Sequence, residues 1–215
     1  PLNLNNPHTD NENIEIQKIE YIREKFLSTS GIFGFELMEP SSIELMSVIE
    51  AKSGPAIRDD VYFFNDKGDR EVSLRFDFTV GLTRYVTGQK SMKLPAKISA
   101  FGGVWRYDEP QKGRYRFFHQ WDIEIFGKQN TETDAEIIEF TSKFFSNLGL
   151  ENTILSISHR KIVQSYISSV FESDKPELIS DILRAIDKIQ KKSKQEIFSE
   201  YEKKGYAKEK LEKII

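Results

Sequence analysis

The stretch 101-FGGVWRYDEPQKGRYRFFHQWDIEIFG-127 decides the fold of this chain, because its second half alternates between two kinds of side chain. One face carries Arg116, Phe118, Gln120, Asp122 and Glu124, and the opposite face carries Phe117, His119, Trp121, Ile123 and Ile125. A period of two is typical of a β-strand that separates two environments. We therefore expect a strand whose second face, His119 included, packs into the core.

A second strand is expected just before this one. Arg106 and Asp108 share a face of the run that precedes the segment EPQKGRY, where proline and glycine indicate a turn. The sequence predicts a long antiparallel hairpin with Arg106 and Asp108 on one arm and Gln120 and Glu124 on the other. The loop at its tip carries two cations.

The run 105-WRYDEPQKGRYRFFHQWDIEIFG-127 resembles motif 2 of histidyl-tRNA synthetase, a class II aminoacyl-tRNA synthetase. The resemblance rests on an arginine, an acidic residue two positions later, a QKGRYR loop and the pattern F-x-Q-x-D-x-E. It implies an α+β fold of the class II type, with an antiparallel β-sheet flanked by helices and a small helical segment at the C-terminal end.

Two further segments follow the order of the same family. The stretch 34-GFELMEP-40 resembles motif 1, which builds the homodimer interface, so a homodimer through the region around Pro40 is implied. The stretch 74-LRFDFT-79 resembles the first histidine-binding segment, L-R-x-[DE]-x-T. Without the resemblance, the polar row of Ser73, Arg75, Asp77 and Thr79 is also typical of a solvated sheet face.

Periodicity places the remaining elements. Helices are expected over 16–26, 79–88, 133–148 with a capping box at Thr133 and Glu136, and from 159 onward. Strands are expected at 34–40, at 61–65 and 70–76 as a second hairpin, and at 153–158.

The chain is expected to have two parts. Residues 1–172 form the catalytic-domain portion with motifs 1 and 2, and the lysine- and glutamate-rich residues 173–215 resemble the start of the helical insertion domain. In the family that domain contacts the tRNA acceptor stem, although lysines among glutamates are also typical of a solvated surface. No G-x-G-x-x-R pattern follows residue 127, so motif 3 and the anticodon-binding domain are expected to lie outside this chain.

Composition narrows the class of protein. The 215 residues carry a net charge of −3, no cysteine and three histidines, which argues against disulfides and thiolate or histidine-rich metal sites. No apolar run reaches the ~20 residues of a membrane span. We expect a cytoplasmic protein without a resident metal and without a membrane contact.

The resemblance implies a ligase that activates L-histidine with ATP to histidyl-adenylate and transfers it to tRNA(His). Arg106 would be the catalytic residue, holding the α-phosphate and the histidine carboxylate in its planar fork. ATP would also contact Asp108, Arg114 and Phe118, and Mg²⁺ is expected to accompany the nucleotide. Without motif 3, activity of this chain alone is not implied.

Histidine itself would be bound by Asp77, Phe78, Thr79, Arg106, Gln120 and Glu124. Carboxylate and amide oxygens suit its ammonium group, and Glu124 would accept a hydrogen bond from the imidazole N–H. The alternative is a non-catalytic relative, the histidyl-tRNA synthetase-like regulatory subunit of ATP phosphoribosyltransferase in histidine biosynthesis.

Overall fold

The computed structural model describes residues 13–109, 111–190 and 192–215, and the chain divides into two compact units, residues 1–155 and 156–215. Helices and strands occur together in the first unit, and the second unit is helical, which confirms the α+β class. Among the described ranges, none of the helices has the length and hydropathy needed to cross a membrane.

The predicted motif 2 hairpin forms the centre of the first unit. Strand β5 (Ala96–Trp105) pairs antiparallel with β6 (Phe117–Phe126) over ten residue pairs, from Ala96 opposite Phe126 to Trp105 opposite Phe117. The short strand β1 (Glu36–Leu37) joins the other edge of β5 in parallel orientation, so the sheet order is β1-β5-β6. The predicted strand at 34–40 is confirmed, but only two of its residues pair.

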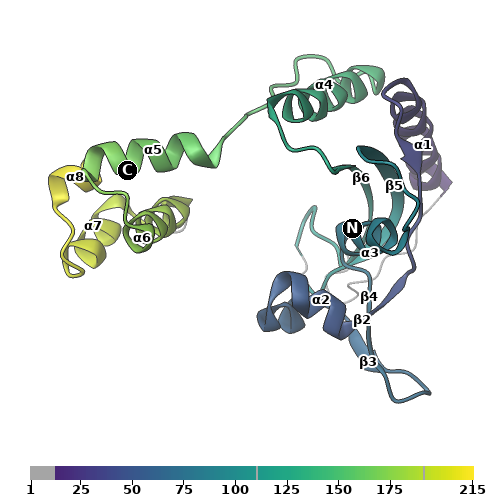
Figure 1. Cartoon of the computed structure of the whole chain (residues 1–215), viewed down its shortest axis with the longest axis horizontal. Coiled ribbons are helices and arrows are strands. Elements are labelled where there is room, and N and C mark those ends of the chain that lie inside the picture. The colour runs from purple at the N-terminus through teal and green to yellow at the C-terminus, as the bar shows by residue number, and fades with distance from the viewer. Residues whose placement is uncertain (1–12, 110, 191) are drawn as a thin grey trace. The chain divides into compact units, whose positions relative to one another are not determined.

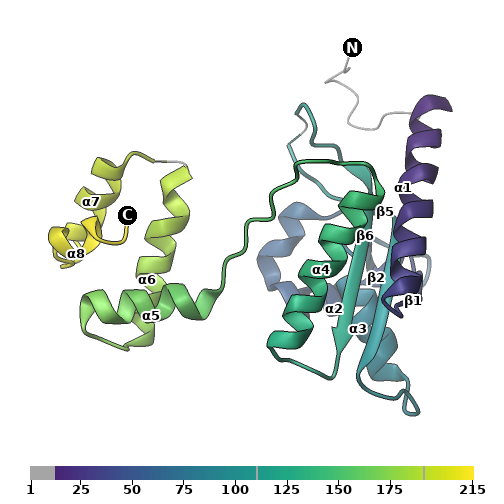
Figure 2. The same ribbon diagram turned by 90° about the horizontal axis from the view of Figure 1, so that it is seen from above.

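Helices cover both faces of this sheet (Figures 1 and 2). On one face, α1 (Asn13–Ile32) and α4 (Thr131–Asn147) bury a cluster that includes Phe26, Phe140 and Trp121. On the other face, α3 (Thr79–Gly88) packs through its own cluster against β5. The predicted division of β6 into two faces is confirmed. His119 is an exception, because it lies beside Phe117 and Phe101 but is exposed rather than part of the core.

A second sheet of three short strands lies beneath the first. Its order is β2-β4-β3, with β2 (Ile43–Leu45) and β3 (Phe63–Asn65) both antiparallel to β4 (Glu71–Leu74). Helix α2 (Met46–Ser53) and a 3-10 helix (Pro55–Asp60) connect β2 to β3. The second hairpin is therefore confirmed, although its later strand ends at Leu74 instead of continuing to residue 76.

The interpretation of the polar row along this strand as a solvated face is wrong. Ser73 is fully buried and Arg75 is 5% exposed. The Arg75 side chain lies between the small sheet and the hairpin, where it finds hydrogen-bond partners described below.

Two local predictions after the hairpin are also wrong. Helix α4 begins one turn earlier than expected, with a capping box between Asn130 and Thr133 rather than between Thr133 and Glu136. Residues 153–158 form no strand, and Ile154 and Ile157 are 87% and 67% exposed. The apolar run predicts a strand, but no strand of the described residues pairs with it, and an isolated strand is unstable in water.

The second unit has a core of its own. Helices α5 (Arg160–Phe171), α6 (Pro176–Asp187), α7 (Lys194–Glu202) and α8 (Lys208–Glu212), with a 3-10 turn at Lys188–Gln190, confirm the predicted helical C-terminal segment. Its fully buried residues are Ile167, Ile182, Ala185, Ile197, Tyr201 and Leu211. Because Ile167 of α5 belongs to this core, the division between compact units falls earlier in the chain than the expected domain boundary at 172/173.

Candidate functional site

Arg106 and Gln120 meet directly across the hairpin. Arg106 follows the last residue of β5, and its Nη2 donates a hydrogen bond of 3.0 Å to Oε1 of Gln120 on β6. Its Nε donates to the backbone carbonyl of Phe76 at 3.0 Å. These two contacts hold the guanidinium at the junction between the hairpin and the segment that leads to Asp77.

The Phe118 ring lies next to this guanidinium. The central carbon of the Arg106 guanidinium is 5.1 Å from the ring centroid of Phe118, a distance that gives a cation–π attraction. Phe118 is only partly buried against the cluster beneath the sheet. A guanidinium and an aromatic ring thus lie together at the end of the sheet where β5 ends and β6 begins.

The loop at the hairpin tip brings Asp108 and Arg114 into proximity. Nε of Arg114 lies 3.9 Å from Oδ2 of Asp108, and the Arg114 side chain is 56% exposed. Arg116 donates from Nε to the Asp108 carbonyl at 3.1 Å, and its guanidinium stacks 3.9 Å from the Tyr107 ring centroid. The loop therefore presents an exposed cation beside Asp108, two residues beyond Arg106 on the first arm of the hairpin.

Asp77 and Thr79 lie where the chain enters α3. Oδ2 of Asp77 accepts from Nζ of Lys52, at the end of α2, at 3.3 Å, and Thr79 is the first helical residue. Phe78 differs from its neighbours, because its side chain is fully buried in the cluster with Leu82 and Val104. The Phe78 ring therefore packs in the core and does not line a surface.

The carboxyl groups of Asp122 and Glu124 share the Gln120 face of β6. The register sets Gln120 opposite Gly102, Asp122 opposite Ala100 and Glu124 opposite Ile98, so small or apolar β5 residues lie beside these polar groups. Burial raises the pKa of Asp122 most, and repulsion from Glu124 and from Asp77 raises it further, to about 7. Asp77, Asp122 and Glu124 are thus electrostatically coupled.

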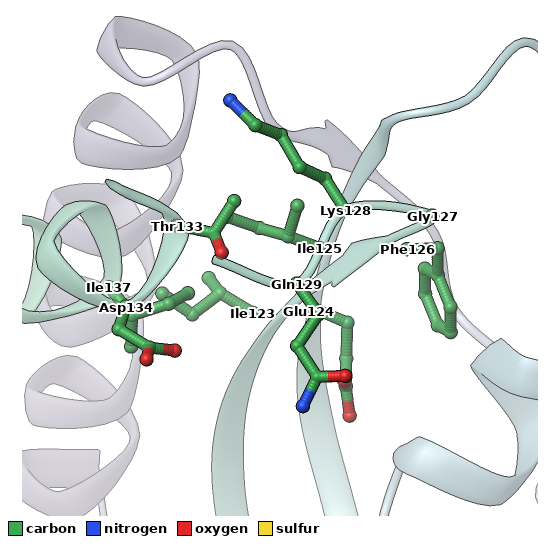
Figure 3. Close-up of a pocket in the computed structure, with 10 residues that line it drawn as sticks. All are labelled: Ile123, Glu124, Ile125, Phe126, Gly127, Lys128, Gln129, Thr133, Asp134 and Ile137. Atoms are coloured by element: carbon green, nitrogen blue, oxygen red, sulfur yellow. The ribbon is translucent and has the colours of Figure 1, made fainter. Parts of the chain in front are cut away.

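A groove with a volume of about 650 Å³ runs along the free edge of β6, between this strand and α4. Figure 3 shows Ile123 and Ile125 directed toward Ile137 of α4, whereas Glu124 is directed away from that helix. The groove reaches Glu124 but is not lined by Arg106, Gln120 or Asp77. Glu124 therefore lines this groove, whereas the hydrogen bond between Arg106 and Gln120 lies outside it.

Arg75 is a site-supporting residue whose role the sequence did not reveal. Its guanidinium donates from Nε to the Gly103 carbonyl at 2.8 Å, from Nη1 to the Pro40 carbonyl at 2.7 Å, and from Nη2 to Glu39 at 3.0 Å. Its central guanidinium carbon also lies 4.9 Å from the centroid of the Phe78 ring. The arginine of the L-R-x-[DE]-x-T pattern was the available signal, but its partners come from segments distant in sequence.

Lys52 is the second residue that sequence reasoning missed. It lies in the last turn of α2, and only the fold brings its ammonium group to Asp77. No periodicity or motif marks such a long-range ion pair.

Within the described ranges, no group of three or more histidine, cysteine, aspartate or glutamate side chains is arranged to hold a metal ion.

Known proteins resemble this chain in sequence and in structure. The family model described as histidyl-tRNA synthetase matches residues 9–213. The chain is 30% identical over 196 residues to the histidine–tRNA ligase of Pyrobaculum islandicum, which covers 91% of this chain and 46% of that protein. The chain spans about half the length of the curated relatives it matches.

Two solved structures share the fold. The histidyl-tRNA synthetase of Nostoc sp. PCC 7120 matches 93% of this chain and 44% of its own, with a TM-score of 0.77 and 22% identity. The ATP phosphoribosyltransferase regulatory subunit/histidyl-tRNA synthetase of Bacillus halodurans C matches 83% of this chain and 46% of its own, with a TM-score of 0.72 and 18% identity. The match of the family model over residues 9–213 shows that the chain belongs to the histidyl-tRNA synthetase family.

Proposed function

We propose that this chain carries the ATP- and histidine-binding half of a histidine–tRNA ligase. The observation that supports this most is the contact between Arg106 and Gln120, which places the residue proposed for ATP beside one proposed for histidine. The proposed reaction joins the histidine carboxylate to the α-phosphorus of ATP with release of pyrophosphate, and the histidyl group then passes to tRNA(His).

Arg106 has the chemistry that the first step requires. The displacement at phosphorus depends on positioning and on neutralising charge rather than on a protein nucleophile. A guanidinium can contact a phosphate and a carboxylate through parallel N–H donors. With its Nε engaged by the Phe76 carbonyl, Arg106 is oriented in advance, and Phe118 and the exposed Arg114 are available for the base and the outer phosphates.

The acidic side chains suit histidine. In the proposal, Asp77, Thr79 and Gln120 receive the ammonium group, and Glu124 accepts a hydrogen bond from the imidazole N–H. A carboxylate left unpaired by an amino acid without that N–H penalises binding, and discrimination built in this way reaches roughly 10⁴-fold. Phe78 contributes to this site through the backbone that it anchors in the core.

The wider assignments belong to the same proposal. Residues 1–172 would act as the catalytic portion and 173–215 as the start of an insertion domain that approaches tRNA(His). A homodimer would form through the segment around Pro40, whose carbonyl accepts a hydrogen bond from Arg75. Mg²⁺ would enter with ATP.

Histidine-dependent exchange of pyrophosphate into ATP tests the proposal. In the full-length protein, Arg106→Ala should reduce the exchange rate by at least ~10²-fold, because the transition state loses a charge-assisted clamp. The exposed Arg160, at the start of α5, offers a matched control, and Arg160→Ala should leave the rate unchanged. Undiminished exchange in Arg106→Ala would overturn the role of Arg106.

The same assay separates the regulatory alternative. A regulatory relative would bind histidine without exchanging pyrophosphate into ATP, even in the unaltered protein. Exchange by the unaltered protein that depends on both histidine and Arg106 would exclude that alternative.

Glu124→Gln tests the histidine assignment. The amide removes the charge that attracts the imidazole N–H, so the dissociation constant for histidine should rise by ~10-fold or more while that for ATP stays within about twofold. Calorimetric titration of each ligand measures both constants. Equal losses for the two ligands would contradict the assignment.

A further inference from the structure

Asp122 is a partly buried titratable group that the proposed reaction does not use. Its carboxyl lies on the Gln120 face of β6, and its Oδ2 atom is buried without a hydrogen-bond partner. The backbone N–H of Ile123 acts to lower the pKa of the same group. A carboxylate oxygen left without a donor in a buried position is costly, whereas a protonated carboxyl is not.

The surroundings of Asp122 explain why it lacks a donor. Ala100 lies directly opposite on β5, and the cluster formed by Phe78, Leu82 and Ile98 packs beneath the same face. None of these side chains can donate a hydrogen bond. The apolar environment therefore favours the neutral carboxylic acid.

The charged groups around Asp122 act in the same direction. Glu124 on β6 and Asp77 before α3 both repel a second negative charge, and Lys52 at the end of α2 is the cation that opposes them. Lys52 is already paired with Asp77, at 3.3 Å, so it neutralises Asp122 only in part. As a result, the pKa of Asp122 is raised to about 7.

We propose that Asp122 is a positioning residue of the histidine site, and that it releases its proton to solvent when an ammonium group binds between it and Asp77. This inference rests on the proposed function, because the ammonium is that of the bound amino acid. The O–H bond of the Asp122 carboxyl breaks, the proton leaves to buffer, and the carboxylate left behind gains the incoming ammonium as its charge partner.

The charge balance of the site favours this exchange. An ammonium group that pairs with Asp77 offsets the repulsion that Asp77 exerts on Asp122, and it supplies the hydrogen-bond donor that Oδ2 lacks. The pKa of Asp122 then falls below the working pH. The cation is held by two carboxylates only after the proton has left, so binding of the ammonium and loss of the proton are linked.

Calorimetric titration in buffers of different ionisation enthalpy measures the protons released on binding. The probe is histidinol, which carries the ammonium and the ring, and it is titrated into the unaltered protein and into Asp122→Asn, so that protons exchanged by the ring itself cancel. Near pH 7, a carboxyl with this pKa is about half protonated, so histidinol should release about half a proton more from the unaltered protein than from Asp122→Asn, rising toward one at pH 6.

The variant Asp122→Asn keeps the shape of the side chain but cannot release the proton. It should therefore lack this extra proton release, whereas Glu151→Gln, at an exposed site, should keep it. If Asp122→Asn does not fold, a carbon-13 NMR titration of aspartate carboxyl groups in the unaltered protein replaces it. One carboxyl should then titrate near pH 7 without ligand and well below pH 7 with histidinol.

The outcomes separate this inference from the proposed function. Tight binding of histidinol with equal proton release from the unaltered protein and from Asp122→Asn overturns the role of Asp122 and leaves the histidine site standing. Failure of both histidine and histidinol to bind the full-length protein overturns the proposed function and this inference with it.

Discussion

Arg75 and Asp122 are charged side chains that the fold removes from water, and their burial has opposite effects on stability. The Arg75 guanidinium has a partner for each of its three nitrogens, so its charge is compensated at 5% exposure. Asp122 has an unpartnered Oδ2 beside apolar residues and two other carboxylates. The first arrangement stabilises the fold, and the second lowers stability whenever Asp122 is ionised.

The pH dependence of stability follows from the raised pKa of Asp122. Because this pKa, about 7, exceeds the ordinary value of 3.8, the folded state holds a proton that the unfolded state has lost between these values. The stability contributed by this proton is present below pH 4 and is lost as pH rises to 7.

Asp122→Asn removes this titration. The difference in free energy of unfolding between the variant and the unaltered protein should change with pH. Between pH 4 and pH 8 it should shift in favour of the variant by on the order of 2 kcal/mol, after allowance for partial solvation. Urea denaturation across this range measures the difference. A constant difference between the two proteins would contradict the assignment.

At the scale of elements, the β5–β6 hairpin depends on a close approach between its arms. The Phe117 ring of β6 lies over Gly103 of β5, and a Cβ placed on Gly103 would lie 2.3 Å from a ring carbon. Glycine at the last position of the FGG sequence, residues 101–103, therefore leaves room for the Phe117 ring.

Gly103→Ala should destabilise the protein by about 1–3 kcal/mol, because the Phe117 ring must leave its position. Gly31, in the last turn of α1, has open space around the corresponding Cβ. Gly31→Ala is thus the matched control, and it should be neutral or stabilise by up to about 1 kcal/mol. Thermal and urea unfolding compare the two, and equal effects would show that the close approach does not limit the hairpin.

At the scale of the whole molecule, two separate cores divide the chain. Phe140 belongs to the core of the first unit and Ile197 to that of the second, and both are fully buried. Residues 153–158, around the division, contribute no paired strand. Because each unit has its own core, a mutation in one core should destabilise that unit and leave the other unchanged.

Ile197→Ala should cost about 2–5 kcal/mol in the second unit alone. Hydrogen exchange followed by mass spectrometry should then show faster exchange in α5 to α8 and unchanged exchange in β5 and β6. Phe140→Ala should give the reverse pattern. Faster exchange throughout the chain in either variant would indicate one cooperative unit.

The hairpin, the faces of β6 and most of the helices could be predicted from the sequence, because each of these follows from a local period or a local turn. The sequence also placed Arg106 and Gln120 on opposite arms of the hairpin, but the register sets Gln120 opposite Gly102, so their hydrogen bond depends on how the Arg106 side chain lies in the fold. The family resemblance placed Asp77 near them on the basis of a motif.

The burial of the site and its charge depend on contacts that form only when the chain folds. The long-range partners of Arg75, the ion pair of Lys52 with Asp77, and the apolar surroundings of Asp122 join segments that are far apart in the chain. The strand predicted at 153–158 fails for the same reason, because a strand requires a partner that its own sequence cannot specify. Periodicity reports which face a side chain occupies, whereas the pKa and the partners of that side chain depend on what the rest of the fold brings to that face.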